Sequence, residues 1–324
     1  MDLTTSKASL RARSEEIGVG LADFLSGLWE LMESLEPFAW QPTDAADVWD
    51  KVQEENSFYF AFDAPELTSA YFSAAFARIF DYVAPATPGV GAQTQAELKT
   101  IVGELTDDEV RGGLVDATKL MRLITGRLAD RLKATAGKGK EEGDDPLAAA
   151  AAVHLTVISA LTPTATAATA QLTISEHLAP ALKDGHCPVC GRPADVGVIR
   201  EAAQGEGGRR ELWCSFCGAI WNFERIRCTR CGTRAQSELS FHFNEGDRAR
   251  RVYYCKACGG AQKVIALRDL PKTDDFDVRV ESIAMAGLED AVRSHAERLF
   301  AAMPAGLEVA TDEACDDQSS RAGD

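Results

Sequence analysis

The sequence predicts an α+β protein, in which an all-helical N-terminal domain precedes two tandem rubredoxin-like or zinc-ribbon-like tetrathiolate modules and a short C-terminal helix. Two observations carry this prediction. Apolar residues recur at three- and four-residue steps through the first half of the chain, which is typical of amphipathic helices. Eight of the nine cysteines then form four Cys-x-x-Cys pairs, at Cys187/Cys190, Cys214/Cys217, Cys228/Cys231 and Cys255/Cys258.

The composition limits the class of protein. The chain has 324 residues and is 45% hydrophobic, so it can bury one large core or two ordinary ones. A net charge of −16 argues against non-specific attraction to nucleic acid or anionic lipid, and we expect neither as a partner. Residues 1–16 lack the apolar run of an export signal, so a cytoplasmic location is expected. The apolar window 147–161 is shorter than the roughly 20 residues that a membrane span needs.

The domain predicted for residues 1–184 is built from helices. Apolar stripes predict them over residues 21–35, 44–62, 72–83, 110–132, 147–161 and 163–182. Thr106 followed by Glu109 predicts a capping box before the fourth helix. Pro163 suits the start of a new helix, because proline is favoured in a first helical turn. Residues 134–146 are rich in Gly, Lys and acidic side chains, and we expect a flexible loop there.

The cysteine pairs form an internal duplication. The step from the first pair to the third is 41 residues, as is the step from the second to the fourth, and each copy reads Cys-x2-Cys-x23-Cys-x2-Cys. This register predicts two modules, over residues 185–226 and 227–270. The first site would be Cys187, Cys190, Cys214 and Cys217, and the second Cys228, Cys231, Cys255 and Cys258. The alternative, in which the second and third pairs share one ion, conflicts with the duplication.

Each copy also carries the signals of a β-hairpin. A glycine follows every pair, at Gly191, Gly218, Gly232 and Gly259, where a positive φ turns the backbone toward the thiolates. In the first copy, residues 196–199 and 209–213 are β-rich and flank the glycine-rich turn 205–208. In the second copy, residues 239–243 and 250–254 flank a turn at 244–247.

Four cysteines per site suit either iron or zinc, and the spacing does not choose between the two metals. Because protein fills all four positions, such a site is structural or electron-transferring rather than hydrolytic. A thioredoxin-like redox pair would need one Cys-x-x-Cys rather than four. We find no nucleophile triad, phosphate loop or dinucleotide fingerprint, so no catalytic residue is predicted and an enzyme is not expected.

The C-terminal end is expected to be simple. Residues 271–303 predict a polar connection and one helix, and the acidic residues 304–324 predict a disordered tail in which Cys315 is an incidental free thiol. Loss of the first metal site is expected to loosen its ribbon, while the helical domain keeps its own core.

The wording of the module resembles a known family. Residues 185–193 (GHCPVCGRP), 213–217 (WCSFC) with Trp221, and 227–232 (RCTRCG) are similar to the formate dehydrogenase accessory protein family FdhE. The resemblance is specific over residues 185–259 and concerns only the architecture elsewhere. It implies a cytoplasmic assembly factor that is needed for active formate dehydrogenase, binds its catalytic subunit, and holds iron in a rubredoxin-like module without catalytic turnover of its own.

A client-binding surface follows from that expectation. The candidate contacts are the arginines of the module, foremost Arg209, Arg210, Arg225 and Arg227, although the simpler interpretation is that these arginines balance the thiolate charge and solvate the hairpins. Two other functions stay open. One is a nucleic-acid-binding zinc ribbon, whose stacking residues would be Trp213, Trp221, Tyr253 and Tyr254. The other is an electron carrier or redox sensor, which requires iron with accessible thiolates.

Overall fold

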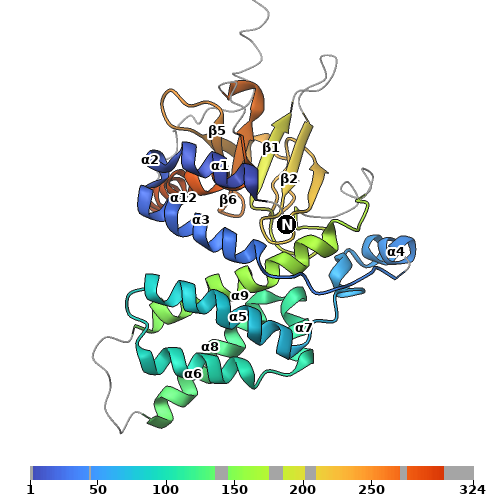
Figure 1. Cartoon of the computed structure of the whole chain (residues 1–324). Coiled ribbons are helices and arrows are strands. Elements are labelled where there is room, and N and C mark those ends of the chain that lie inside the picture. The colour runs from blue at the N-terminus through green and yellow to red at the C-terminus, as the bar shows by residue number, and fades with distance from the viewer. Residues whose placement is uncertain are drawn as a thin grey trace, which may run out of the picture.

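A computed structural model describes residues 3–43, 45–135, 145–174, 185–200, 209–270 and 276–302. Its N-terminal part is helical, its middle part is a β-sheet, and two further helices follow (Figure 1). The helices are α1 (Thr4–Ala12), α2 (Ser14–Ile17), α3 (Val19–Glu33), α4 (Ala45–Glu55), α5 (Ser69–Val83), α6 (Ala92–Gly103), α7 (Asp107–Val115), α8 (Ala117–Thr135), α9 (Pro146–Thr169), α11 (Val278–Ala284) and α12 (Ala286–Ala302). The predicted fold class is confirmed.

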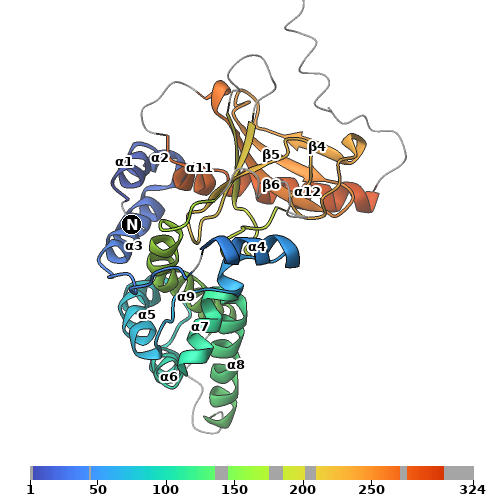
Figure 2. The same ribbon diagram turned by 90° about the vertical axis from the view of Figure 1, so that its right-hand side faces the viewer.

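Helix α5 lies at the centre of the helical bundle. Phe72, Phe76 and Phe80 recur at four-residue steps along it, and all three rings are fully buried. Burial of such a ring contributes about 1.5–3 kcal/mol each, which is why this stripe faces inward. Helix α5 packs on α9, α6 and α3, and Figures 1 and 2 show α3 and α9 between helices α5 to α8 and the sheet.

The single helix predicted over residues 110–132 is wrong, because the structure forms α7 and α8 with a break at Asp116. The backbone of Asp116 leaves the helical region, with φ −139° and ψ 85°. Its carboxylate accepts a hydrogen bond of 3.0 Å from the Lys119 backbone N–H, as the N-cap of a new helix does. Helix α6 (Ala92–Gly103) is not among the helices that the apolar stripes predict.

The helix start predicted at Pro163 is also wrong. Helix α9 runs without interruption from Pro146 to Thr169, with Pro163 inside it. An internal proline costs about 3 kcal/mol, and the helix continues because every residue from 159 to 165 is buried against its neighbours. By length and composition alone α9 is apolar enough to cross a membrane, yet 61% of its most apolar window is buried inside the protein, as in a core helix.

The capping box predicted at the start of α7 is confirmed. The Thr106 hydroxyl accepts from the Glu109 backbone N–H at 3.3 Å, and the Glu109 carboxylate accepts from the Thr106 backbone N–H at 2.9 Å. That second bond is the main cause of a lowered pKa for Glu109.

We predict that the free energy of unfolding of the helical bundle falls in mild acid, because Glu109 becomes protonated there. Because the pKa of Glu109 is lower in the folded state, its carboxylate stabilises the fold at pH values above the ordinary pKa of glutamate. This stabilisation is lost as the pH falls through the folded-state pKa. Thr106→Ala should reduce the free energy of unfolding at pH 7 by about 1 kcal/mol, and Glu109→Gln should flatten the acid limb. Urea unfolding between pH 3 and 7 measures both effects, with Thr100→Ala on exposed α6 surface as the control. An unchanged acid limb in Glu109→Gln would contradict this prediction.

The six strands form one sheet across both cysteine modules. They are β1 (Val196–Arg200), β2 (Arg209–Trp213), β3 (Ile220–Phe223), β4 (Leu239–His242), β5 (Arg250–Cys255) and β6 (Gly260–Ala266), in the order β3-β2-β1-β6-β5-β4. Both predicted hairpins are present, as the antiparallel pairs β1/β2 and β4/β5. Strands β3 and β6 are not predicted from the sequence, and neither is the parallel pairing of β1 with β6 that joins the modules.

Helix α12 covers one face of the sheet, and α11 connects this region to the N-terminal helices α1 and α2. Val198, Val252 and Ile265 pack with Met285 and Val292 under α12 (Figure 2). Helix α11 in turn contacts α1 and α2. Among these contacts, the Ser6 hydroxyl donates to Asp277 at 2.7 Å and Arg13 pairs with Glu281. Predictions made for 304–324 with Cys315, for most of the loop 134–146, for residues 175–182, for the turn 205–208 and for residues 271–275 fall outside the described residues.

Candidate metal centres

The first cysteine cluster joins the turn that precedes β1 to the turn between β2 and β3. Cys187, Cys190, Cys214 and Cys217 bring their sulfurs within 4.8 Å of one another, in an arrangement that could hold a metal ion. The Sγ atoms of Cys187 and Cys217 are 3.5 Å apart, and those of Cys190 and Cys214 are 3.6 Å apart. All four side chains are buried, with at most 1% exposed.

The second cluster repeats this arrangement, joining the segment before β4 to the turn between β5 and β6. Cys228, Cys231, Cys255 and Cys258 also gather within 4.8 Å. The Sγ separation is 3.7 Å both for Cys228 to Cys258 and for Cys231 to Cys255. The four pairs therefore combine first with second and third with fourth, as the 41-residue register predicts.

Both clusters fit a tetrahedral ion. With metal–sulfur distances of about 2.3 Å, the sulfurs of a tetrahedral site stand about 3.8 Å apart, close to the separations in both clusters. An all-sulfur tetrahedral donor set suits zinc or iron. Four protein sulfurs leave no coordination position for water or substrate, so the chemistry of either site is structural or electron-transferring.

The four turns share one backbone geometry, and glycine is required in each. Gly191, Gly218, Gly232 and Gly259 have φ between 67° and 75°, a left-handed conformation that favours glycine. Each glycine N–H bonds back to the carbonyl of the first cysteine of its pair. The Arg230 N–H also donates to the Cys228 sulfur at 3.4 Å, as expected for a turn whose amides point at thiolates.

Burial and hydrogen bonding shift the pKa values of the cysteine thiols in opposite directions. Burial raises the pKa of Cys187 and Cys190 well above the ordinary value, whereas hydrogen bonds from the neighbouring thiols hold the pKa of Cys214 well below it. In the second cluster burial raises the pKa of Cys255, while the Thr233 backbone N–H lowers that of Cys231. Because metal ligation requires thiolates, binding a cation would release protons and strengthen with rising pH.

The two clusters differ in their exposure to solvent. The first is sealed by the helical part, because the Tyr59 and Phe60 backbone N–H groups donate to the carbonyls of Pro188 and Val189 at 2.8 Å. In the second cluster Cys231 and Cys258 are exposed, while Cys228 and Cys255 are buried. The contacts of Tyr59 and Phe60 with the first turn are not predicted from the sequence. The aromatic-rich run at residues 58–62 is the signal that could have indicated them.

Substitution of Gly191 tests how tightly the first Cys-x-x-Cys turn is packed. A Cβ at Gly191 would lie 2.5 Å from the Phe58 ring, whereas a Cβ at Gly259 would meet nothing closer than the Tyr254 hydroxyl at 3.8 Å. Both glycines have positive φ, so alanine strains both backbones. We predict that Gly191→Ala reduces the free energy of unfolding by about 2–4 kcal/mol and Gly259→Ala by about 1 kcal/mol. Chemical denaturation measures the two, and equal losses would contradict the packing argument.

The predicted partner-contact arginines fall into two groups. Arg209 is exposed and Arg225 is half-buried, whereas Arg210 and Arg227 are only 2% and 6% exposed. The side chains of Arg210 and Arg227 are therefore almost fully covered by the protein itself, whereas those of Arg209 and Arg225 reach the surface. The Arg210 and Arg227 side chains are buried because both guanidinium groups pack over the ring of Phe223.

Burial also bears on the nucleic-acid alternative. Trp213, Trp221 and Tyr254 are buried in the sheet, so these rings are covered by the protein itself. Only Tyr253 of the four predicted stacking residues is partly exposed. A row of buried rings offers no platform for bases, which need an open aromatic face.

Comparison with known proteins shows which family has a similar cysteine module. The family model for the FdhE central domain matches residues 186–225, which hold the first cluster and β1 to β3. Residues 186–225 are thus similar to the FdhE central domain. A protein named FdhE homolog from Stutzerimonas stutzeri is 35% identical over 98 residues, which cover 30% of this chain and 31% of that protein. These findings confirm the FdhE family resemblance predicted from the cysteine module.

Two further FdhE homologs extend the comparison. The protein from Aquifex aeolicus is 30% identical over 32% of this chain and 33% of its own length. The protein from Rhizobium meliloti is 30% identical over 50% of this chain and 52% of its own length. The chain thus matches about a third to a half of the length of these FdhE relatives.

The fold comparison reaches beyond the central domain. The crystal structure of the FdhE protein from Pseudomonas aeruginosa aligns with 90% of this chain and 90% of its own, with a TM-score of 0.53 and 19% identity. The two chains therefore share a fold, including helical and sheet parts.

Proposed function

We propose that this chain is an accessory protein for formate dehydrogenase, acting as an assembly factor that binds the catalytic subunit of that enzyme in the cytoplasm. The observation that carries the proposal is the FdhE central domain at residues 186–225, because it coincides with the first four-cysteine cluster. The role itself is what the family resemblance implies.

The metal sites support a scaffold rather than a catalyst. We propose that the eight clustered cysteines hold two metal ions, iron or zinc, one in each cluster. With no coordination position left for a substrate, neither ion would act as a Lewis acid on one. The proposed function is therefore non-catalytic, and the metals hold the ribbon surface in shape for the client.

The proposed client surface includes Arg209 and Arg225. Arg209 is exposed at the start of β2, and Arg225 is half-buried in the segment that links the two modules. Both belong to the basic part of a chain that is otherwise strongly acidic. Charge complementarity with an acidic patch on the client would steer the encounter more than it would strengthen the complex.

Affinity purification from a host that produces formate dehydrogenase tests the proposal. We expect the catalytic subunit to copurify with the chain, and elemental analysis of the same sample to give two metal ions per chain. Arg209→Glu should weaken capture, whereas Arg268→Glu, an exposed arginine paired with Asp269, serves as the matched control. Absence of the dehydrogenase from the purified complex would refute the assembly role, whatever the metal content.

A second candidate function is electron transfer at the second cluster. The exposed sulfurs of Cys231 and Cys258 favour it, because an electron carrier needs a site that a partner can approach. It requires iron in that cluster. Protein purified without oxygen should then show a reversible absorbance change on reduction, and colourless protein with two zinc ions would exclude this function.

A further inference from the structure

The second cluster exposes only half of its ligands. Each of its Cys-x-x-Cys pairs contributes one buried and one exposed cysteine, because Cys228 and Cys255 are 7% and 3% exposed, whereas Cys231 and Cys258 are open to solvent. The four sulfurs still lie within 4.8 Å of one another. Each pair therefore gives the cluster one inner and one outer ligand, and a molecule that approaches from solution meets Cys231 and Cys258 first.

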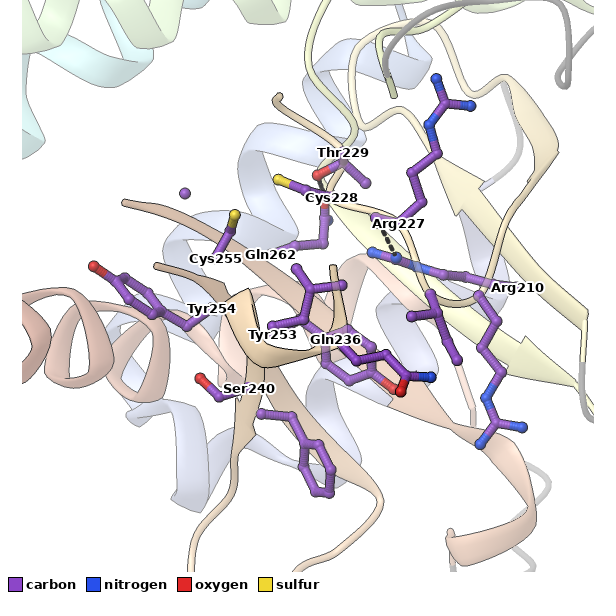
Figure 3. A pocket seen from close by; sticks show the side chains of 15 residues that line it. Arg210, Arg227, Cys228, Thr229, Gln236, Ser240, Tyr253, Tyr254, Cys255 and Gln262 are labelled. Carbon is purple, nitrogen blue, oxygen red and sulfur yellow. Dashed lines mark hydrogen bonds between the residues drawn. The ribbon is translucent and has the colours of Figure 1, made fainter. Parts of the chain in front are cut away.

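The two inner ligands are held in place by the protein around them. Cys228 and Cys255 line a pocket between the two cysteine modules, and Figure 3 shows their sulfurs near each other. Cys255 ends β5 and is paired with Gly260 of β6. The segment of Cys228 is anchored by the Gly185 N–H, which donates to the Thr229 carbonyl at 2.8 Å. A metal ion would therefore keep Cys228 and Cys255 as ligands while its outer ligands are exchanged.

The turn that carries Cys258 is not packed into the helical bundle. Residues 257–259 are all exposed, and Cys258 lies outside the apolar core that contains every cysteine of the first cluster. In the first cluster, the turn at Gly218 lies against α9, because a Cβ there would be 3.6 Å from Thr166 Cγ2. The other turn of that cluster is sealed by residues 58–60. Cys258 can therefore leave an ion without loss of contacts with the bundle.

Basic side chains lie beside the outer ligands. Four thiolates around a divalent cation leave an excess of negative charge, which would repel an approaching thiolate. The stem of Arg230 lies against this site, since a Cβ at Gly260 would be 2.5 Å from Arg230 Cδ and 3.1 Å from Cys258 Sγ. Lys256 belongs to the same turn as Cys258, and its ammonium donates to the Ser237 carbonyl at 3.3 Å. These two cations offset part of the thiolate charge and so ease the approach of an anionic acceptor.

We propose that the second cluster passes its metal ion to a metal-free set of cysteines in another polypeptide. The acceptor sulfurs replace Cys231 and Cys258 first, while Cys228 and Cys255 hold the ion, and the inner pair is replaced afterwards. Each acceptor thiol gives up a proton as it binds the ion, and each released cysteine takes one up, so the exchange needs no oxidant or reductant. The first cluster keeps its ion. This transfer goes beyond the proposed assembly role and does not depend on it.

Native mass spectrometry of the full chain loaded with two zinc ions tests this transfer. Zinc has no redox chemistry, so only ligand exchange is measured. The acceptor is a reduced, metal-free synthetic peptide with two Cys-x-x-Cys pairs and no basic residue, in about hundredfold excess so that mass action favours transfer. We expect one ion per chain to move, at a rate that rises in proportion to the peptide concentration. A rate independent of peptide concentration, movement of both ions in one phase, or no movement would overturn the proposal.

Charge variants connect the transfer to the outer ligands. Arg230→Glu should slow it about tenfold, because the reversed charge beside Cys258 repels the acceptor thiolate. Arg122→Glu makes the same change of charge on the exposed surface of α8 and should leave the rate unchanged. The zinc content before the peptide is added checks that both variants are loaded. If Arg230→Glu does not retain two ions, Arg230→Gln takes its place, with an expected slowing of about threefold. Equal transfer rates in the Arg230 and Arg122 variants would overturn the proposal.

Discussion

Cys190→Ser is expected to remove one metal ion per chain and to destabilise the helical bundle together with the first ribbon. Metal binding at a structural four-cysteine site contributes folding free energy on the order of 10 kcal/mol. Here that energy is shared with the bundle, because the sulfurs of the first cluster lie in the same apolar core as α5 and α9. The Phe60 N–H also depends on the Val189 carbonyl of the same turn.

The duplication supplies a matched control for this variant. Cys231 occupies the position of Cys190 in the second copy, yet it is exposed and lies outside the apolar core of the bundle. Cys231→Ser should also remove one ion while it leaves the melting of the bundle nearly unchanged. Elemental analysis and circular dichroism at 222 nm measure both effects, and we expect a loss of at least about 10 °C in melting temperature for Cys190→Ser alone.

This expectation differs from the one that the sequence supports. With a helical domain at residues 1–184 separate from the ribbons, the bundle would survive loss of the first site. The contacts of Tyr59 and Phe60 with the first turn predict coupled unfolding instead. If Cys190→Ser and Cys231→Ser melt alike, the helical part is independent and the coupling drawn from these contacts is wrong.

The second large effect concerns the rate at which the clusters release their metals. A chelator must reach the ion or its ligands, and the exposed Cys231 and Cys258 offer that access, whereas the first cluster is sealed on every sulfur. We predict biphasic release, in which one ion leaves at least tenfold faster than the other, on the order of the differences that exposure makes to cysteine reactivity.

Mass spectrometry assigns the two phases. During the fast phase iodoacetamide should modify Cys231 and Cys258 before it modifies any cysteine of the first cluster. The Cys231→Ser protein serves as the control, since only the slow phase should remain in it. A single release rate for both ions, or early alkylation of Cys187, would contradict the difference in burial.

Local sequence signals predicted the parts of the fold that depend on neighbours in the chain. The stripe from Phe72 to Val83 became α5, and Thr106 with Glu109 formed the expected cap. The failures were at Asp116 and Pro163, where a local signal competes with its surroundings. At Asp116 the side chain caps a new helix, and at Pro163 buried packing maintains a helix that proline would otherwise end.

The sequence by itself determined the two sets of four cysteines, because the turn of a Cys-x-x-Cys-Gly segment is local and the 41-residue register assigns each pair to its partner. Only the tertiary structure decided that β1 pairs with β6 and that the pocket lies between the modules. It also decided that one cluster is sealed and the other open. Burial depends on which distant segment covers a site, and here residues 58–60 cover the first turn from more than a hundred positions away, which no local spacing encodes.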